Sequence, residues 1–362
     1  MHRHGDHLCP EPEQHGFAWK LTVFASFLLS VLHRSVFLTL GTLCGLIIPL
    51  LQAHAQDFKD VPPAHPAFTA IEDLQMRGIL SGYPDGTFKP EKNVARSEAV
   101  KMIMAPLLAG KDVSQHSSSP YTDVPKGIWY LPYTEEARMR GVIDGPPQKT
   151  TFQGERTVLK AEFIKMLLKA NSIDLGFLQD VHDPFAIDVQ PSDWHASFMA
   201  YSVASSMLSP SSDWELQPGH ELTRADAAVL LSTFFQYREG KRTQALLSAA
   251  DREMTSVLQS FEAKNSRVAL YAATTGLLEA KGAEQSRPET LTNGVVQLGE
   301  AFLDLAKGNI AGSVGQYAQS AALAGEAWGK AGKATEASAT LAPIGQKVQD
   351  IAHTMAESAR GH

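Results

Sequence analysis

Cysteine is nearly absent from this chain, and positive charge is not in excess. The only two cysteines of the 362 residues are Cys9 and Cys44, and both precede the expected end of an export signal at Ala55. A chain cleaved there would hold no disulfide, no thiol nucleophile and no cysteine-bound metal. The formal net charge is −7, which gives no reason to expect a nucleic-acid partner.

Recognisable catalytic patterns are missing as well. The sequence contains no glycine-rich phosphate loop, no HExxH and no GxSxG. Asp60 and Asp85 could suggest a calcium loop, but the alternating oxygen ligands of such a loop are missing. The acidic pair Glu135-Glu136 falls on an amphipathic helix and is expected to be solvated. We therefore predict no catalytic residue, no metal and no cofactor.

Long apolar runs are confined to the first 55 residues. Arg34 precedes an apolar run at residues 35–51, which is shorter than the roughly 20 residues of a membrane span. Small residues follow it, so we predict a secretory signal cleaved between Ala55 and Gln56, with an uncleaved membrane anchor as the alternative. Residues 1–30 lie upstream of a signal of ordinary length, and we expect the true translation start to lie after Met1.

A repeated pattern fills the middle of the chain. It is clearest around the sequence GYPDGTF at residues 82–88, and each pass takes about 60–65 residues. An aspartate opens each pass, and a basic residue follows roughly 36 positions later; the three pairs are Asp60 and Arg96, Asp123 and Lys160, and Asp188 and Arg224. Such self-similarity indicates supersecondary units that bury their core against one another.

Each pass predicts two helices joined by a loop. In the first, apolar residues have helical spacing over residues 66–76, Gly78 ends the helix, and Pro84-Asp85-Gly86 has the composition of a turn. A second apolar helix follows Arg96. The same order recurs twice, so we predict an all-α fold.

The last third of the chain changes in composition. Beyond residue 240 it is rich in alanine, with apolar residues three and four positions apart. We predict an antiparallel bundle of about four helices at 241–362, with breaks at 282–288, at Gly308-Asn309 and near Gly332. Its apolar stripes are expected to form an internal core rather than a partner or membrane surface.

The repeat resembles the S-layer homology family over residues 57–238, through the Asp-Val pair, the GYPDGTF turn and the Arg-Ser-Glu triplet at residues 96–98. We call the repeats the first, second and third copies, at residues 56–110, 119–171 and 184–238. The resemblance implies a pseudo-threefold trimer of copies within one chain. It also implies a ligand, an acidic cell-wall polysaccharide that often carries a ketal-linked pyruvate.

The candidate ligand residues are the three basic ones at the helix starts, Arg96, Lys160 and Arg224. Free backbone N–H groups are expected there to favour an anion, and arginine can bind a carboxylate through two hydrogen bonds. Lys160 departs from the arginine of the family and loses that fork. Further candidates are Trp129 and Trp194 as sugar platforms or core residues, Gly82, Tyr83 and Asp85 at a groove rim, and Asp60, Asp123 and Asp188 as structural loop residues.

These features together predict an exported, non-catalytic protein. Its three copies would bind anionic, possibly pyruvylated, cell-wall polysaccharide, and its helical bundle would be displayed with a possible protein partner. It would lie at the cell wall or cell surface, on the periplasmic face of the envelope if an outer membrane is present. The alternatives are an enzyme acting on wall or polysaccharide, which the repeats would target, and a structural S-layer subunit.

Overall fold

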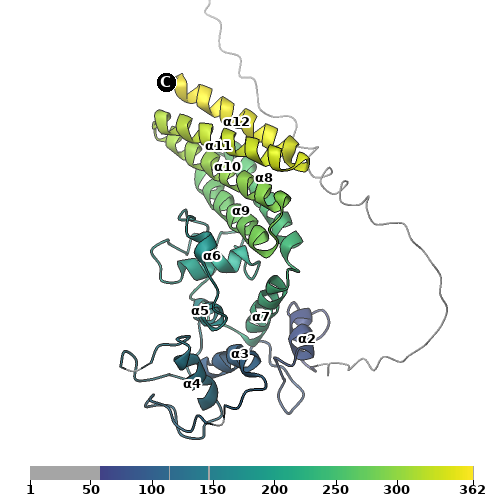
Figure 1. Ribbon diagram of the computed structural model, residues 1–362, viewed down its shortest axis with the longest axis vertical. Helices are drawn as coiled ribbons and strands as arrows, with labels where there is room; N and C mark the ends of the chain where they lie inside the picture. Colours follow the sequence, from purple (N-terminus) through teal and green to yellow (C-terminus); the bar gives the residue numbers. More distant parts are fainter. Residues whose placement is uncertain (1–57, 114, 146, 362) are drawn as a thin grey trace, which may run out of the picture. The chain divides into compact units, whose positions relative to one another are not determined.

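The computed structural model describes residues 58–113, 115–145 and 147–361, which belong to one compact unit spanning residues 54–362. Within these residues the regular structure is helical and there is no strand, which confirms the predicted all-α class (Figure 1). The predicted leader, the cleavage site between Ala55 and Gln56, and both cysteines lie outside the described residues.

Each copy contributes two helices, as its apolar spacing predicts. The helices are α2 (Phe68–Met76) and α3 (Arg96–Leu108), α4 (Leu131–Met139) and α5 (Lys160–Ala170), and α6 (Ala196–Ala204) and α7 (Arg224–Arg238). A short 3-10 helix (Gly176–Leu178) lies between the second and third copies. Glycine follows the first helix of two copies at positive φ, +68° at Gly78 and +67° at Gly141, where a side chain would be strained.

Three backbone segments connect the copies in a closed cycle of hydrogen bonds. Val94 N donates to Leu222 O (2.8 Å), Leu222 N donates to Val158 O (3.0 Å), and Val158 N donates to Val94 O (3.0 Å). The three residues are 64 positions apart and are completely buried. The cycle satisfies backbone polar groups that burial would otherwise leave unpaired. Each copy thus supplies a hydrogen-bond partner to both of the others.

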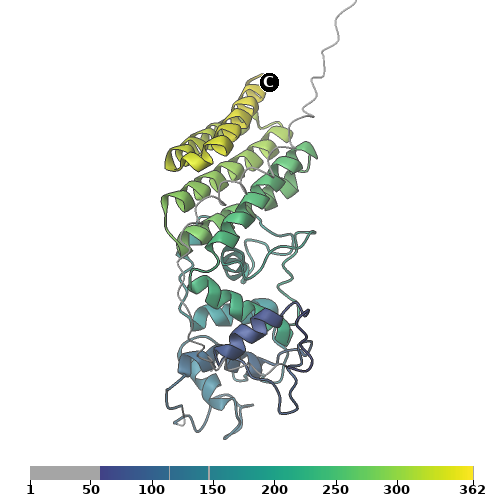
Figure 2. The same cartoon turned by 90° about the vertical axis from the view of Figure 1, so that its right-hand side faces the viewer.

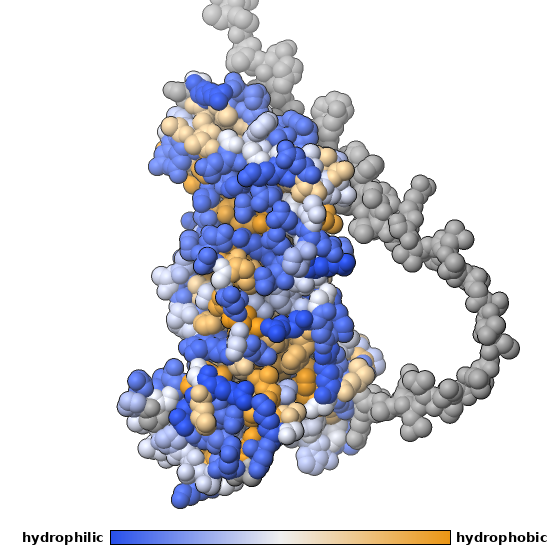
Figure 3. Space-filling view, in the orientation of Figure 1, coloured by the Kyte–Doolittle hydropathy of each residue, from blue (hydrophilic) through white to orange (hydrophobic). Residues whose placement is uncertain are grey.

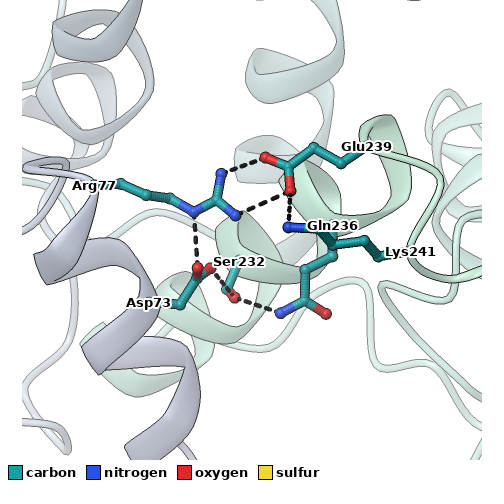
Figure 4. Close-up of polar contacts among 6 residues, drawn as sticks. All are labelled: Asp73, Arg77, Ser232, Gln236, Glu239 and Lys241. Atoms are coloured by element: carbon teal, nitrogen blue, oxygen red, sulfur yellow. Dashed lines mark hydrogen bonds and ion pairs between the residues drawn. The ribbon is translucent and has the colours of Figure 1, made fainter. Parts of the chain in front are cut away.

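The helices of neighbouring copies pack in pairs, α3 with α4, α5 with α6, and α2 with α7. The pair α2 and α7 closes the circuit between the first and third copies. A polar network reinforces it: Arg77 Nε donates to Asp73 (2.8 Å), and Arg77 Nη2 donates to Glu239 just beyond α7 (3.2 Å; Figure 4). Ser232 on α7 donates to the other oxygen of Asp73 (2.7 Å). One apolar core draws on all three copies.

Five helices follow where the sequence predicts about four. They are α8 (Thr243–Glu262), α9 (Ser266–Ser286), α10 (Thr290–Ser313), α11 (Tyr317–Ala337) and α12 (Ala342–Arg360). Each packs on the next in chain order, and the two views show them side by side (Figures 1 and 2). None of the described helices is both long and apolar enough to cross a membrane. Hydrophilic residues cover most of the face seen in Figure 3.

Two of the predicted helix breaks are wrong. The break at residues 282–288 matches the end of α9, but Gly308 lies inside α10 and Gly332 inside α11. Both glycines sit where another helix approaches. An added Cβ would come within 2.8 Å of Met355 Sδ at Gly308 and 3.2 Å of Gln349 Nε2 at Gly332. These glycines allow close packing instead of ending helices.

The C-terminal helices are continuous with the third copy. α6 packs on α9 so closely that a Cβ added at Gly282 would overlap Ala204 O. Tyr237 Oη donates to Gly282 O (3.1 Å). Two lysines of this region also pair with the segment before the third copy, Lys281 with Asp180 (3.0 Å) and Lys307 with Asp183 (3.1 Å).

Candidate functional site

The opening aspartate of each copy holds the loop that precedes the second helix. In the first copy the two carboxylate oxygens of Asp60 accept hydrogen bonds from Phe88 N and Lys89 N, both at 2.7 Å. Lys89 has φ +58°, a left-handed conformation that is costly for a residue with a side chain. The bonds to Asp60 offset that cost and fix the loop.

The other two copies reproduce this arrangement. Asp123 accepts from the N–H groups of Phe152 and Gln153, both at 2.7 Å, and Gln153 has φ +60°. Asp188 accepts from Leu216 N (3.0 Å) and Gln217 N (2.6 Å), and Gln217 has φ +55°. The three aspartates are therefore engaged by backbone groups of their own loops.

The N–H groups at the starts of α3, α5 and α7 are also engaged. Arg96 N donates to Arg156 O (2.8 Å) and Ser97 N to Gly154 O (2.9 Å), so the second copy caps the second helix of the first. The corresponding donor and acceptor pairs are Lys160 with His220, Ala161 with Pro218, Arg224 with Lys92, and Ala225 with Pro90. The expectation that free backbone N–H groups bind an anion at these helix starts is wrong, because carbonyl groups of the next copy occupy them.

Two of the three basic side chains are bound to the protein itself. Arg224 is 8% exposed, and its Nε donates to Phe88 O (2.8 Å) and its Nη2 to Ser81 O (3.3 Å). Its Cζ also lies 4.5 Å from the centre of the Phe88 ring. Lys160 Nζ donates to Leu216 O (2.9 Å), and burial lowers the pKa of this amine.

Arg96 differs from its two counterparts. Its Cζ lies 5.5 Å from the Phe152 ring centre, in the position that Arg224 takes over Phe88. Its guanidinium makes no hydrogen bond to any residue that the structure describes, although the side chain is half-buried. Burial lowers the pKa of Arg96, while the nearby Glu162 carboxylate raises it. The five N–H donors of this fork are therefore available to a bidentate acceptor.

Glu162 does not neutralise Arg96 because it has its own partners. Its carboxylate accepts from both Nη atoms of Arg156 (3.0 and 2.9 Å) and from Leu159 N (3.1 Å). Burial alone would raise the pKa of Glu162, but these bonds and the nearby charge of Arg96 bring it below its usual range. At the site between the first and second copies, Arg96 thus forms no ion pair with any described residue.

Two tryptophans present exposed rings beside lysines. Trp129 is 49% exposed with Lys101 Nζ 5.4 Å from its ring centre, and Trp194 is 55% exposed with Lys165 Nζ at 5.3 Å. Exposure at this level places the rings at the surface and not in the core. Sequence reasoning missed both lysines, although their separation of 64 residues was a signal that could have found them.

The GYPDGTF turn forms a rim beside Arg224. A Cβ added at Gly82 would lie 2.3 Å from the Phe58 ring, so only glycine fits there. The Tyr83 ring lies 4.2 Å from Lys89 Nζ and 5.0 Å from Arg224 Cζ. Asp85 is committed to the turn, because its carboxylate accepts from Thr87 N (3.0 Å) and from the Thr87 hydroxyl.

A comparison with known protein families matches the part of the chain that contains the Asp60 loop. The model of the S-layer homology domain matches residues 57–100, which include the Asp60 loop, the turn and the start of α3. The chain carries an S-layer homology domain. This finding confirms the predicted S-layer homology resemblance at residues 57–100, in the first copy, and it indicates a cell-surface or cell-wall location.

Several curated proteins are similar to part of this chain. The chain is 28% identical over 136 residues to S-layer protein EA1 of Bacillus anthracis, 38% of this chain and 15% of that protein. It is 30% identical over 164 residues to a cellulosome-anchoring protein of Acetivibrio thermocellus (42% and 34%). It is 28% identical over 166 residues to an amylopullulanase of Thermoanaerobacterium thermosulfurigenes (44% and 8%). The chain thus spans about a third or less of each relative's length.

Proposed function

We propose that this protein is an exported, non-catalytic wall-attachment protein. Its three S-layer homology copies, at 56–110, 119–171 and 184–238, bind an acidic cell-wall polysaccharide without a covalent bond. Residues 241–362 are the helical module that it displays. A similar segment is present in an S-layer protein, an anchoring protein and an enzyme, which supports attachment as its role and assigns no reaction to it.

The observation that carries the proposal is the unpaired guanidinium of Arg96. A carboxylate on the polymer, such as a ketal-linked pyruvate, matches its planar fork and replaces the water that a half-buried cation holds poorly. The exposed Trp129 ring and Lys101, which lies on the same helix as Arg96, offer a sugar face and a second cation.

The three basic residues differ in how free they are to bind a ligand. Arg224 is almost sealed and donates to two carbonyl groups, and Lys160 is held by a third. A ligand at either residue would have to break those bonds first. We therefore propose that attachment depends chiefly on the site between the first and second copies.

Exchange of Arg96 tests this function. Arg96→Gln removes the charge and keeps most of the stem, whereas Arg96→Lys keeps the charge and loses the fork. We expect Arg96→Gln to bind purified wall sacculi at least about tenfold more weakly in co-sedimentation, which corresponds to one lost charge-assisted contact, and Arg96→Lys to fall between it and the wild type.

The control is Lys126→Gln, which removes an exposed lysine of the second copy. It should bind like the wild type. Equal retention of the wild type and Arg96→Gln across a range of salt concentrations would refute the role of Arg96, since an ionic contact weakens with salt.

A further inference from the structure

A cavity lies outside the sites described so far, where the third copy meets α8 and α9. Its volume is about 330 Å³, within the range of small-molecule sites. Its walls come from the loop at residues 210–214, from α8 and from α9, and include Ser212, Trp214, Glu253, Ser256 and Val268. The Trp214 ring stands 6.0 Å from the Tyr271 ring of α9, centre to centre.

Trp214 occupies a position that normally favours glycine. Its φ is +62°, and its carbonyl accepts from Ile187 N (2.8 Å) as the carbonyl of Gly86 accepts from Lys59 N (3.1 Å) in the first copy. Gly86 has φ +81°. A bulky side chain at a left-handed position is strained, and such strain is concentrated at functional sites. The third copy thus places the Trp214 indole at the cavity wall, at the cost of a strained backbone conformation at that residue.

Three polar side chains around this cavity lack partners among the described residues, whereas Ser211 Oγ accepts from Asp213 N and Glu215 N (both 3.2 Å). Glu253 makes no hydrogen bond or ion pair with any residue that the structure describes, and the hydroxyls of Ser212 and Ser256 make no hydrogen bond there. Glu253 leans over α9 at Gly276, where an added Cβ would lie 3.2 Å from Glu253 Cβ. Glu279, one turn further along α9, is 4% exposed, and its Oε2 is buried without a partner.

Two neighbouring carboxyl groups that form no ion pair with any described residue favour a positively charged ligand, although the charge of Arg252 already acts to lower the pKa of both. Burial raises the pKa of Glu253, and burial together with Glu253 raises that of Glu279. A bound cation would relieve both effects. The described residues contain no group of three or more histidine, cysteine, aspartate or glutamate side chains that could hold a metal ion. The charge is therefore better supplied by an organic ammonium group, which the Trp214 face can also bind.

We propose that this cavity binds a small organic molecule carrying a primary ammonium group, which pairs with Glu253 and stacks against Trp214. A free amino sugar and an amine-bearing amino-acid side chain share this chemistry and fit the volume. Neither is a ligand of the Arg96 site, because that site is cationic.

Isothermal titration of the full chain with two matched pairs of probes tests the proposal and separates the two sources. The pairs are glucosamine with N-acetylglucosamine, and Nα-acetyllysine with Nα,Nε-diacetyllysine, where acetylation of the sugar or side-chain amine removes its ammonium charge. We expect one free amine to bind with a dissociation constant of about 1 mM and its acetylated partner at least about tenfold more weakly. The pair that shows this difference identifies the source.

Two variants locate the binding. Glu253→Gln should abolish the preference for the free amine, and Trp214→Gly, which installs the residue of the first copy, should weaken binding about tenfold or more. Glu262→Gln, at the exposed end of the same helix, is the control and should bind like the wild type. Absence of binding by both free amines, equal binding of the acetylated probes, or an unchanged preference in folded Glu253→Gln would overturn the proposal.

Discussion

Glu279 shows how one buried carboxyl group can cost the protein stability. It lies on α9 with its Oε2 buried and without a partner, and burial, together with the nearby Glu253, raises its pKa well above the usual range. A carboxyl group with a raised pKa in the folded state favours its neutral form there. The cost therefore appears at pH values above the unfolded pKa and is full above the folded one.

The variant Glu279→Gln should remove that cost. We expect its melting temperature to exceed that of the wild type by about 2–4 °C at pH 8, and the difference to shrink as the pH falls and to vanish below the unfolded pKa of about 4.3, where the carboxyl group is neutral in both states. Thermal denaturation followed by circular dichroism across this pH range measures the effect. A constant difference at all pH values would show that titration of Glu279 is not its source.

The three basic residues show what a sequence alone can say at this scale. Their equal spacing predicts that Arg96, Lys160 and Arg224 occupy equivalent positions, and the structure places each against the loop of the next copy. The sequence could not say which of them is free. That depends on whether the packing of two loops lets a side chain reach a backbone carbonyl such as Phe88 O.

Helices are the scale at which sequence reasoning worked best and also failed most visibly. Apolar spacing located the two helices of every copy, because one face of each packs into a shared core. Glycine gave the wrong answer at Gly308 and Gly332, since a helix end and a close helix crossing both favour a residue without a side chain. The two cases can be distinguished only when the position of the neighbouring helix is known.

The pairing of α2 with α7 yields a prediction at the same scale. Arg77 bridges Asp73 and Glu239, and its hydrogen bonds hold the pKa of Glu239 at about 2 (Figure 4). Arg77→Ala should lower the melting temperature by about 2–4 °C, because it removes the hydrogen bonds that link the first copy to the third.

The matched control is Arg140→Ala in the second copy. Arg140 pairs with Glu136 four residues earlier on its own helix, and such local pairs contribute only about 0.3–0.5 kcal/mol. Calorimetry should therefore show a smaller loss than for Arg77→Ala. Equal losses would mean that the link between α2 and α7 adds nothing beyond a local ion pair.

At the scale of the whole molecule, the sequence predicts where each copy lies in the chain, but it does not predict the contacts between the copies. The 64-residue interval was visible in the sequence, but the closed cycle through Val94, Val158 and Leu222 consists of backbone hydrogen bonds that no side chain specifies. The junction of the third copy with α9 was not predicted either. It relies on Gly282, which the sequence pattern places at a helix break, as well as on lysine–aspartate pairs between distant segments.

The central claim is that this protein attaches to an acidic wall polymer through a cation held between its copies. The most direct test is co-sedimentation of the full chain with wall sacculi before and after chemical removal of their acidic polymer. The account predicts that the protein sediments with intact sacculi at low salt, is released as salt rises, and stays in solution with stripped sacculi. Equal sedimentation with stripped and intact sacculi would contradict it.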